Sequence, residues 1–160
     1  MLKFTSKGLL QPNLPIPSNI EELKNYFVDQ IPSTIRQHHF ERYIKYSDDL
    51  KALLGGKPIK QWINGSFTSK RVNNPKDIDL VTFISHEEIL ELGESIKPFT
   101  PSQSWEIYEV DAYIVETHDE NSDLHYFSQS DTAYWLEQFG KTKSNRRGFK
   151  EAKGFLEIIY

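Results

Sequence analysis

The part of the chain that most constrains its fold is residues 64–76, a polar, turn-rich stretch between two short apolar runs. The runs Pro58–Ile63 and Ile78–Ile84 have the length and apolar character of strands. Between them, Asn73-Asn74-Pro75 favours a turn and interrupts any regular element. The segment therefore predicts two strands joined by an irregular loop.

Helical and strand-like patterns surround this segment. Apolar residues recur at helical spacing over Thr34–Leu54, and they alternate with mainly polar residues over Trp105–Val115, which is typical of a strand. The other expected elements are helices at 20–31, 86–94 (capped by Ser85) and 130–139, a loop at 97–104, and a closing strand at 154–160. This order predicts an α+β fold, in which helices flank a mixed β-sheet.

Length and composition indicate one domain. A chain of 160 residues suits a single compact domain, and 38 % apolar residues are enough to build its core. We expect an extended N-terminal arm at 1–18, a helical part at 19–56 and a sheet-containing core at 57–160. A net charge of −4 predicts no global attraction to nucleic acid.

Cysteine and hydropathy limit the chemistry and the location. The chain has no cysteine, which excludes disulfides and thiolate metal ligands. No stretch approaches the roughly 18 apolar residues of a membrane span, and the first residues lack the apolar core of a signal peptide. We therefore expect a cytoplasmic protein without membrane association.

Two aspartates begin the second predicted strand. On an extended chain Asp77 and Asp79 point to one face, and Ile78 between them points to the other. Two neighbouring carboxylates repel each other, and a hard divalent cation such as Mg²⁺ relieves that repulsion by accepting oxygen ligands. The pair is therefore a candidate magnesium site.

Gly65 and Ser66 end the first predicted strand and are candidate phosphate ligands. Glycine permits close approach of a ligand to the backbone, and the following turn exposes amide N–H groups to an anion. If the next residues open a helix, its N-terminal dipole also favours phosphate. Lys70 and Arg71, in the loop, are candidates for binding the outer phosphates.

These residues resemble the DNA polymerase β-like nucleotidyltransferase superfamily. Its pattern is an apolar strand, Gly-Ser, about ten residues, and Asp-x-Asp in a strand, matched here by Gly65-Ser66 and Asp77-Ile78-Asp79. Asn64 departs from it, because an apolar residue more often precedes the glycine. Gly8-Leu-Leu-Gln-Pro near the start and Lys153-Gly-Phe-Leu-Glu-Ile near the end look like a small bacterial subgroup of this superfamily.

The resemblance implies a polymerase-β-like sheet topology, with residues 57–160 as the catalytic core. It implies two Mg²⁺ ions and transfer of a nucleoside monophosphate from a nucleoside triphosphate such as ATP to a hydroxyl of an RNA, a protein or a small molecule. A third carboxylate is implied on a later strand; Asp111 is our candidate there, and Glu109, which shares its predicted face, is the alternative. Small members of the superfamily occur in toxin–antitoxin and defence systems.

The candidate contacts for an RNA or protein acceptor lie in a basic segment near the C-terminus. It contains Lys141, Lys143, Arg146, Arg147, Lys150 and Lys153. The alternative is an ordinary solvated loop. His38, His39, His118 and His125 show no helical pair beside a carboxylate, so the sequence does not favour zinc; Trp62, Trp105 and Trp135 are expected in the core.

Two other functions stay open at the level of sequence. In one, the nucleotidyltransferase fold has lost its chemistry and binds a nucleotide, an RNA or a partner protein as a regulator. In the other, the chain is an interaction protein in which Asp77-Ile78-Asp79 is incidental. A partner protein or a second copy of the chain could also complete the site.

Overall fold

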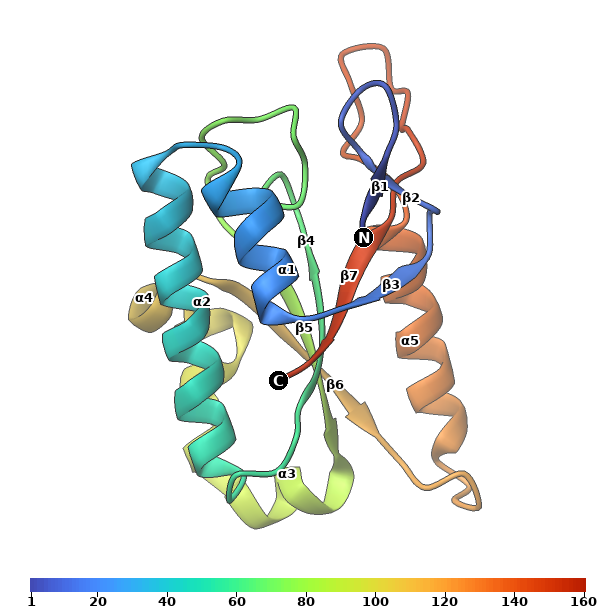
Figure 1. Cartoon of the computed structure of the whole chain (residues 1–160). Helices are drawn as coiled ribbons and strands as arrows, with labels where there is room; N and C mark the ends of the chain where they lie inside the picture. Colours follow the sequence, from blue (N-terminus) through green and yellow to red (C-terminus); the bar gives the residue numbers. More distant parts are fainter.

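The computed structural model describes all residues, 1–160, and has a five-stranded mixed sheet at its centre (Figure 1). Its strands, in spatial order, are β3 (Pro15–Ser18), β7 (Phe155–Ile159), β4 (Lys60–Asn64), β5 (Asp79–Ser85) and β6 (Asp111–Thr117). The pairs β3·β7 and β5·β6 are parallel, whereas β4 is antiparallel to both β7 and β5. The α+β class and the mixed sheet are confirmed.

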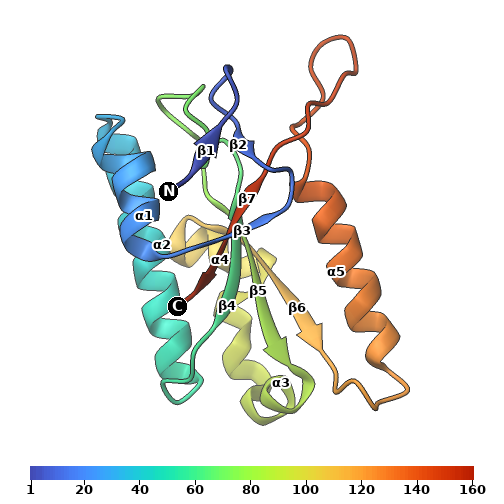
Figure 2. The ribbon, with the colours of Figure 1, turned by 45° about the vertical axis from the view of Figure 1, so that its right-hand side comes forward.

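Helices cover both faces of the sheet. They are α1 (Ile20–Lys24), the π-helical turn η1 (Asn25–Asp29), α2 (Thr34–Leu53), α3 (His86–Leu92), the 3-10 helix η2 (Gly93–Phe99), α4 (Pro101–Tyr108) and α5 (His125–Phe139). Figures 1 and 2 show α1 and α2 on one side of the sheet and α5 on the other. The connection from β5 to the parallel β6 runs through α3, η2 and α4.

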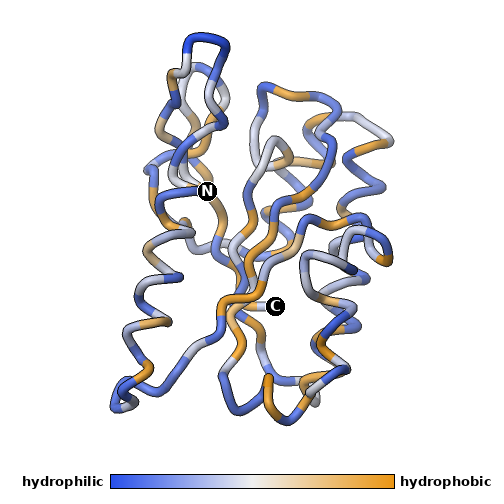
Figure 3. Tube along the Cα trace, turned by 180° about the vertical axis from the view of Figure 1, so that it is seen from behind, coloured by the Kyte–Doolittle hydropathy of each residue, from blue (hydrophilic) through white to orange (hydrophobic).

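The alternation of side chains along the strands produces two apolar cores. On the α2 side, Ile63, Leu80 and Ala112 belong to the larger cluster. On the α5 side, Trp62, Val81, Val115 and Phe155 pack with Phe139 of α5. In Figure 3 the central strands are accordingly the most hydrophobic part of the trace (Figure 3). Both faces of the sheet are therefore buried.

The N-terminal arm is more structured than the sequence indicates. Two short strands, β1 (Lys3–Phe4) and β2 (Leu10–Gln11), form a hairpin, and β3 joins the edge of the main sheet. Leu9 and Leu10 are buried, and the amide of Gly154 donates to the carbonyl of Leu10. The extended conformation expected for residues 1–18 is compatible with this pairing, because Pro12, Pro15 and Pro17 favour extended backbone and Pro is tolerated in an edge strand.

The predicted strand at Trp105–Val115 is wrong in its first part. Residues 101–108 form α4, which Pro101 begins and which buries Ser104 and Tyr108, one helical turn apart. Glu109 adopts a left-handed conformation with φ 56°, and the strand starts only at Asp111. Trp105 is 48 % exposed and is therefore not a core residue. The expected loop at 97–104 is largely helical for the same reason.

Other predicted elements agree closely with the structure. The helix at Thr34–Leu53, the strand at Phe155–Ile159 and the helix that Ser85 caps are confirmed. The Ser85 hydroxyl accepts a hydrogen bond from the amide of Glu88, and the Ser85 amide donates one to the Glu88 carboxylate, which completes a capping box. The last helix begins at His125 rather than at residue 130.

Candidate functional site

Two aspartates lie side by side where β5 and β6 begin. Asp79 and Asp111 are register partners in the parallel pair, and the Asp111 amide donates to the Ile78 carbonyl at 3.1 Å. Ile78 is fully buried while Asp77 and Asp79 are half-buried, so the predicted alternation holds. Since neighbouring strands are about 4.8 Å apart, the sheet brings the three carboxylates to one end and one face.

Gly65 brings the Gly-Ser turn against the same carboxylates. Asn64 pairs with Asp79 across the antiparallel strands, and Gly65 follows it with φ 84°, a value that favours glycine. A Cβ atom on Gly65 would lie 1.9 Å from Oδ2 of Asp79. Because Gly65 has no side chain, the Asp79 carboxylate can contact the turn. The two halves of the predicted motif meet in space.

No helix follows Gly65-Ser66. Residues 65–78 form turns and irregular backbone, with the Thr68 hydroxyl donating to the Gly65 carbonyl at 3.4 Å. The condition under which a helix N-terminus would help to bind phosphate is therefore not met. Any anion near Ser66 would depend on amide groups of the turn and on nearby cations.

The aspartates carry an unfavourable accumulation of negative charge. Burial, and then the charge of Asp77, raise the pKa of Asp79 to about 6, while Lys143 and Lys153 act in the opposite direction. Burial also raises the pKa of Asp111, against a hydrogen bond from Tyr113. Both carboxyls would be ionised more easily if a cation lay between them.

Lys153 is the unexpected member of the site. From the sequence it is a candidate acceptor contact in the basic segment, with a solvated loop as the alternative, yet it is only 7 % exposed, and its Nζ donates to the Gly65 carbonyl at 3.0 Å. Burial lowers its pKa to about 8, and the charge of Asp79 opposes this shift. The amide of Lys153 donates a hydrogen bond to the Gly140 carbonyl, which closes residues 140–153 into a loop and holds Lys153 at its base.

The rest of that loop is exposed and basic. Lys141 and Ala152 form a bridge at its base, and its outer tip is hydrophilic in Figure 3. Lys143 acts electrostatically on both Asp79 and Asp111. The remaining cations of the segment are exposed: Lys141, Arg146, Arg147 and Lys150. Of the predicted acceptor contacts, only Lys153 is buried.

Lys70 and Arg71 lie away from the aspartates. The Nζ of Lys70 sits 4.5 Å from the ring centroid of Phe4 and bonds Gln30. Arg71 pairs with Glu151. Both cations therefore tie the 64–76 loop to neighbouring segments. The sequence could not reveal this, because the partners come from the N-terminal arm, the end of η1 and the basic loop.

Glu109 is separated from the site by its backbone. As the left-handed residue after α4, it turns to His38, whose Nε2 lies 2.9 Å from Oε2, and to Arg42 at 3.7 Å. Between the two alternatives for a third carboxylate, the register of β6 brings Asp111, and not Glu109, beside Asp79.

A buried arginine shapes the 64–76 loop. Arg36 of α2 has no exposed surface and donates hydrogen bonds to the carbonyls of Phe67, Ser69, Val72 and Asn73 and to that of Phe27. Burial lowers its pKa to about 10. Four carbonyls of one loop thus converge on a single guanidinium. The role of Arg36 could not be read from the sequence, because an arginine within a helical pattern gives no sign that it is buried.

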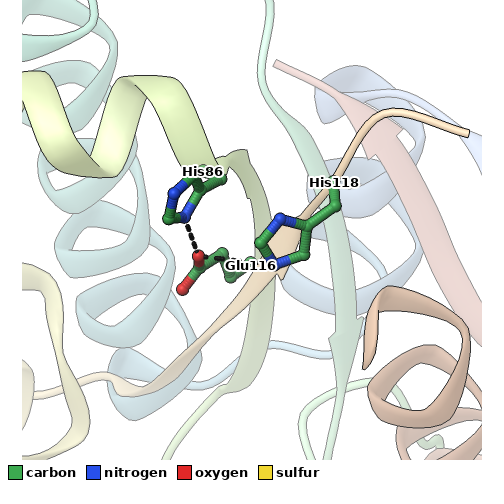
Figure 4. A group of neighbouring side chains, drawn as sticks. All are labelled: His86, Glu116 and His118. Carbon is green, nitrogen blue, oxygen red and sulfur yellow. Dashed lines mark hydrogen bonds and ion pairs between the residues drawn. The ribbon is translucent and has the colours of Figure 1, made fainter. Parts of the chain in front are cut away.

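A second group of ionisable side chains lies at the far ends of β5 and β6. His86, Glu116 and His118 are the one set of three or more His, Asp or Glu residues whose ligand atoms all lie within 4.8 Å of one another (Figure 4). The three aspartates are less tightly gathered. The sequence alone does not connect these residues, because only the β5·β6 register shows that 86 and 118 are neighbours.

The fold and these sites define an α+β protein with a carboxylate cluster at one end of a mixed sheet. The chain belongs to a family described as "Family of unknown function (DUF6932)", whose model matches residues 2–159. Neither the curated proteins nor the solved structures contain a significant match. None of the helices combines the length and apolarity needed to cross a membrane.

Proposed function

We propose that this protein is a Mg²⁺-dependent nucleotidyltransferase, which moves a nucleoside monophosphate from a nucleoside triphosphate to a hydroxyl. The observation that carries the proposal is the meeting of Gly65, Asp79 and Asp111 at one end of the sheet. A glycine turn for phosphate beside several carboxylates is the combination that triphosphate chemistry requires.

The donor set suits magnesium. Asp77, Asp79 and Asp111 offer only carboxylate oxygens, which Mg²⁺ prefers, and the raised pKa values of Asp79 and Asp111 reflect burial and repulsion that a dication relieves. Asp77, Asp79 and Asp111 would hold one or two such ions, which would neutralise the negative charge of the carboxylates and of the bound phosphates. Asp111 would accept a hydrogen bond from the acceptor hydroxyl and so favour its attack on the α-phosphorus, with pyrophosphate leaving.

Two lysines take the place of the loop cations that the sequence suggested. Lys153 lies on the Gly65 turn, and Lys143 lies close enough to influence Asp79 and Asp111. In the proposed complex the turn amides after Gly65 and Ser66 bind the β- and γ-phosphates, and the two lysines neutralise them. Lys70 and Arg71 act indirectly, by holding the loop.

The proposal includes a polymerase-β-like topology. In its support, Gly65-Ser66 ends one strand, Asp77 and Asp79 begin the antiparallel neighbour, and Asp111 begins the next, parallel strand. The irregular turn where a helix was expected is the main departure. The exposed cations of the 141–150 loop would bind the acceptor, either an RNA or a protein.

A second candidate is a regulator with the same fold and no catalysis. Lys153 favours it, because a buried ammonium beside Asp79 can offset part of the negative charge that a metal would otherwise neutralise. Such a protein would bind a nucleotide, an RNA or a partner without Mg²⁺. Metal dependence therefore separates the two candidates.

Calorimetric titration of the four ribonucleoside triphosphates, with and without Mg²⁺, tests the proposal. The wild type should bind at least one of them only with Mg²⁺, and Asp77→Asn/Asp79→Asn should abolish that binding and any incorporation of labelled nucleotide. The control is Asp123→Asn/Asp131→Asn, which makes the same charge change at two exposed positions. Binding without Mg²⁺ and without turnover would favour the regulator. Turnover retained in Asp77→Asn/Asp79→Asn would refute the metal-binding and catalytic roles assigned to these two aspartates.

A further inference from the structure

His86, Glu116 and His118 converge at the end of the sheet opposite to the aspartates. Figure 4 shows the two imidazole rings on either side of the Glu116 carboxylate. Nδ1 of His86 bonds Oε1 of Glu116, and Nε2 of His118 lies 3.5 Å from the same oxygen. The ring centroids of the two histidines are 4.8 Å apart. Two nitrogen donors and one carboxylate thus face a common point.

The backbone holds each of these residues in place. Glu116 lies within β6, opposite Ile84, and His86 directly follows the last residue of β5 at the first position of α3, where the capping box of Ser85 fixes the chain. The amide of His118 donates to Ser128 at 2.7 Å, and its carbonyl bonds His125 at 3.1 Å. The three side chains therefore come from three anchored backbone positions.

We infer that His86, Glu116 and His118 form a binding site for a divalent transition-metal ion of the Zn²⁺ type. Imidazole nitrogen and carboxylate oxygen are the donors that Zn²⁺ accepts, and ligands about 2.1 Å from a tetrahedral ion lie roughly 3.4 Å apart. The ligand atoms of the three side chains lie within 4.8 Å of one another, and one pair is 3.5 Å apart. Small side-chain rotations would bring all of them to the spacing of a tetrahedral site.

The site has room for a further ligand. His86 and Glu116 are 35 % and 39 % exposed, so the fourth position faces solvent. Three protein ligands with an open position are typical of sites that bind water or a substrate, whereas structural zinc sites are closed by four protein ligands. Asp111 and His118 are seven residues apart on an extended chain, so the two metal sites are separated by roughly 20 Å. The zinc site is therefore independent of the proposed Mg²⁺ site.

The chain offers a matched control for this inference. His38 and Glu109 also form a histidine–glutamate pair, with Nε2 and Oε2 2.9 Å apart, but there no second imidazole contacts the carboxylate. A single pair of this kind is a weak chelator, since two ligands leave a metal largely hydrated. Zinc binding should therefore depend on His86 and His118 and not on His38.

The test is titration of the tag-free full chain with Zn²⁺ by calorimetry, and with Co²⁺ by visible absorption. The wild type should bind one ion per chain and give the intense bands of tetrahedral Co²⁺. Affinity should fall at least tenfold in His86→Ala, His118→Ala and Glu116→Gln. It should be unchanged in His38→Ala and in Asp77→Asn/Asp79→Asn.

Thermal unfolding provides a second measurement, which does not require His86→Ala or His118→Ala to fold well. Zn²⁺ at about 100 times the wild-type Kd should raise the Tm of the wild type by about 5–10 °C, and should raise that of Glu116→Gln by at most about half as much, because a tenfold weaker site is then at only about 10 times its own Kd. No saturable Zn²⁺ binding by the wild type, or wild-type affinity in both His86→Ala and His118→Ala, would overturn the inference.

Discussion

The ammonium group of Lys153 donates a hydrogen bond to the carbonyl of Gly65, 3.0 Å away, and so fastens the basic loop to the turn beside Asp79. The two residues are 88 positions apart in the chain. Because the lysine is almost fully buried, its charge interacts strongly with whatever occupies the turn. Measurements of stability and of triphosphate affinity should both detect this charge.

For Lys153→Met we predict that the pH dependence of stability between pH 8 and pH 10 is lost and that the affinity for triphosphate falls. Burial lowers the pKa of Lys153 to about 8. A depressed lysine pKa makes the unfolded chain bind more protons, so wild-type stability should rise between pH 8 and pH 10 and the variant should lack this rise. Urea unfolding across that range checks it. Lys150→Met, at an exposed position, should behave like the wild type.

For Asp79→Asn we predict a more stable protein at neutral pH. The pKa of Asp79 is raised to about 6, so its contribution to stability is present below about pH 4 and is lost as the pH rises through 6. The variant should gain up to about 3 kcal/mol over the wild type at pH 7 without divalent ions, and nearly nothing at pH 4. Saturating Mg²⁺ should reduce the difference. Equal stability at both pH values would contradict the burial of a charged Asp79.

The core of this arrangement was predictable because it depends on local spacing. Side chains alternate along a strand, which places Asp77 and Asp79 on one face. Gly65 and Ser66 follow an apolar run, whichever way the two strands pair. Asp111 followed from the resemblance. The α+β class and the mixed sheet followed from the order of helical and strand-like patterns.

Features that depend on long-range packing were not predictable. Residues 105–108 have an alternation that suits a strand, yet Pro101 and the burial of Tyr108 give a helix. Lys153 and Lys70 differ only in what the fold packs around them, and the first enters the site while the second stacks on Phe4. Likewise, His86 and His118 become neighbours only through strand register.

Arg36→Met should destabilise the protein and loosen the 64–76 loop. The substitution removes the only guanidinium that bonds the carbonyls of Phe67 and Ser69, and it leaves these buried acceptors without a partner. We expect a loss of about 3–5 kcal/mol, measured by urea unfolding. Hydrogen exchange should increase in residues 67–73 before it increases in the sheet. In Arg146→Met, which alters an exposed arginine, neither quantity should change.

Substitution of Gly65 by alanine should separate backbone strain from contact with the carboxylate. Gly65 and Gly55 both have positive φ values, 84° and 69°, so alanine is strained at either position, by about 1–2 kcal/mol. Only at Gly65 does the new Cβ meet an obstacle, because it would lie 1.9 Å from Oδ2 of Asp79, whereas nothing lies within 4 Å of a Cβ at Gly55. We therefore expect Gly55→Ala to lose stability but keep Mg²⁺-dependent nucleotide binding. Gly65→Ala should lose both, since Asp79 must move away from the turn. Calorimetric titration with nucleotide at a temperature where both variants are folded checks this, and equal nucleotide affinity in the two would show that Asp79 does not need its contact with the turn.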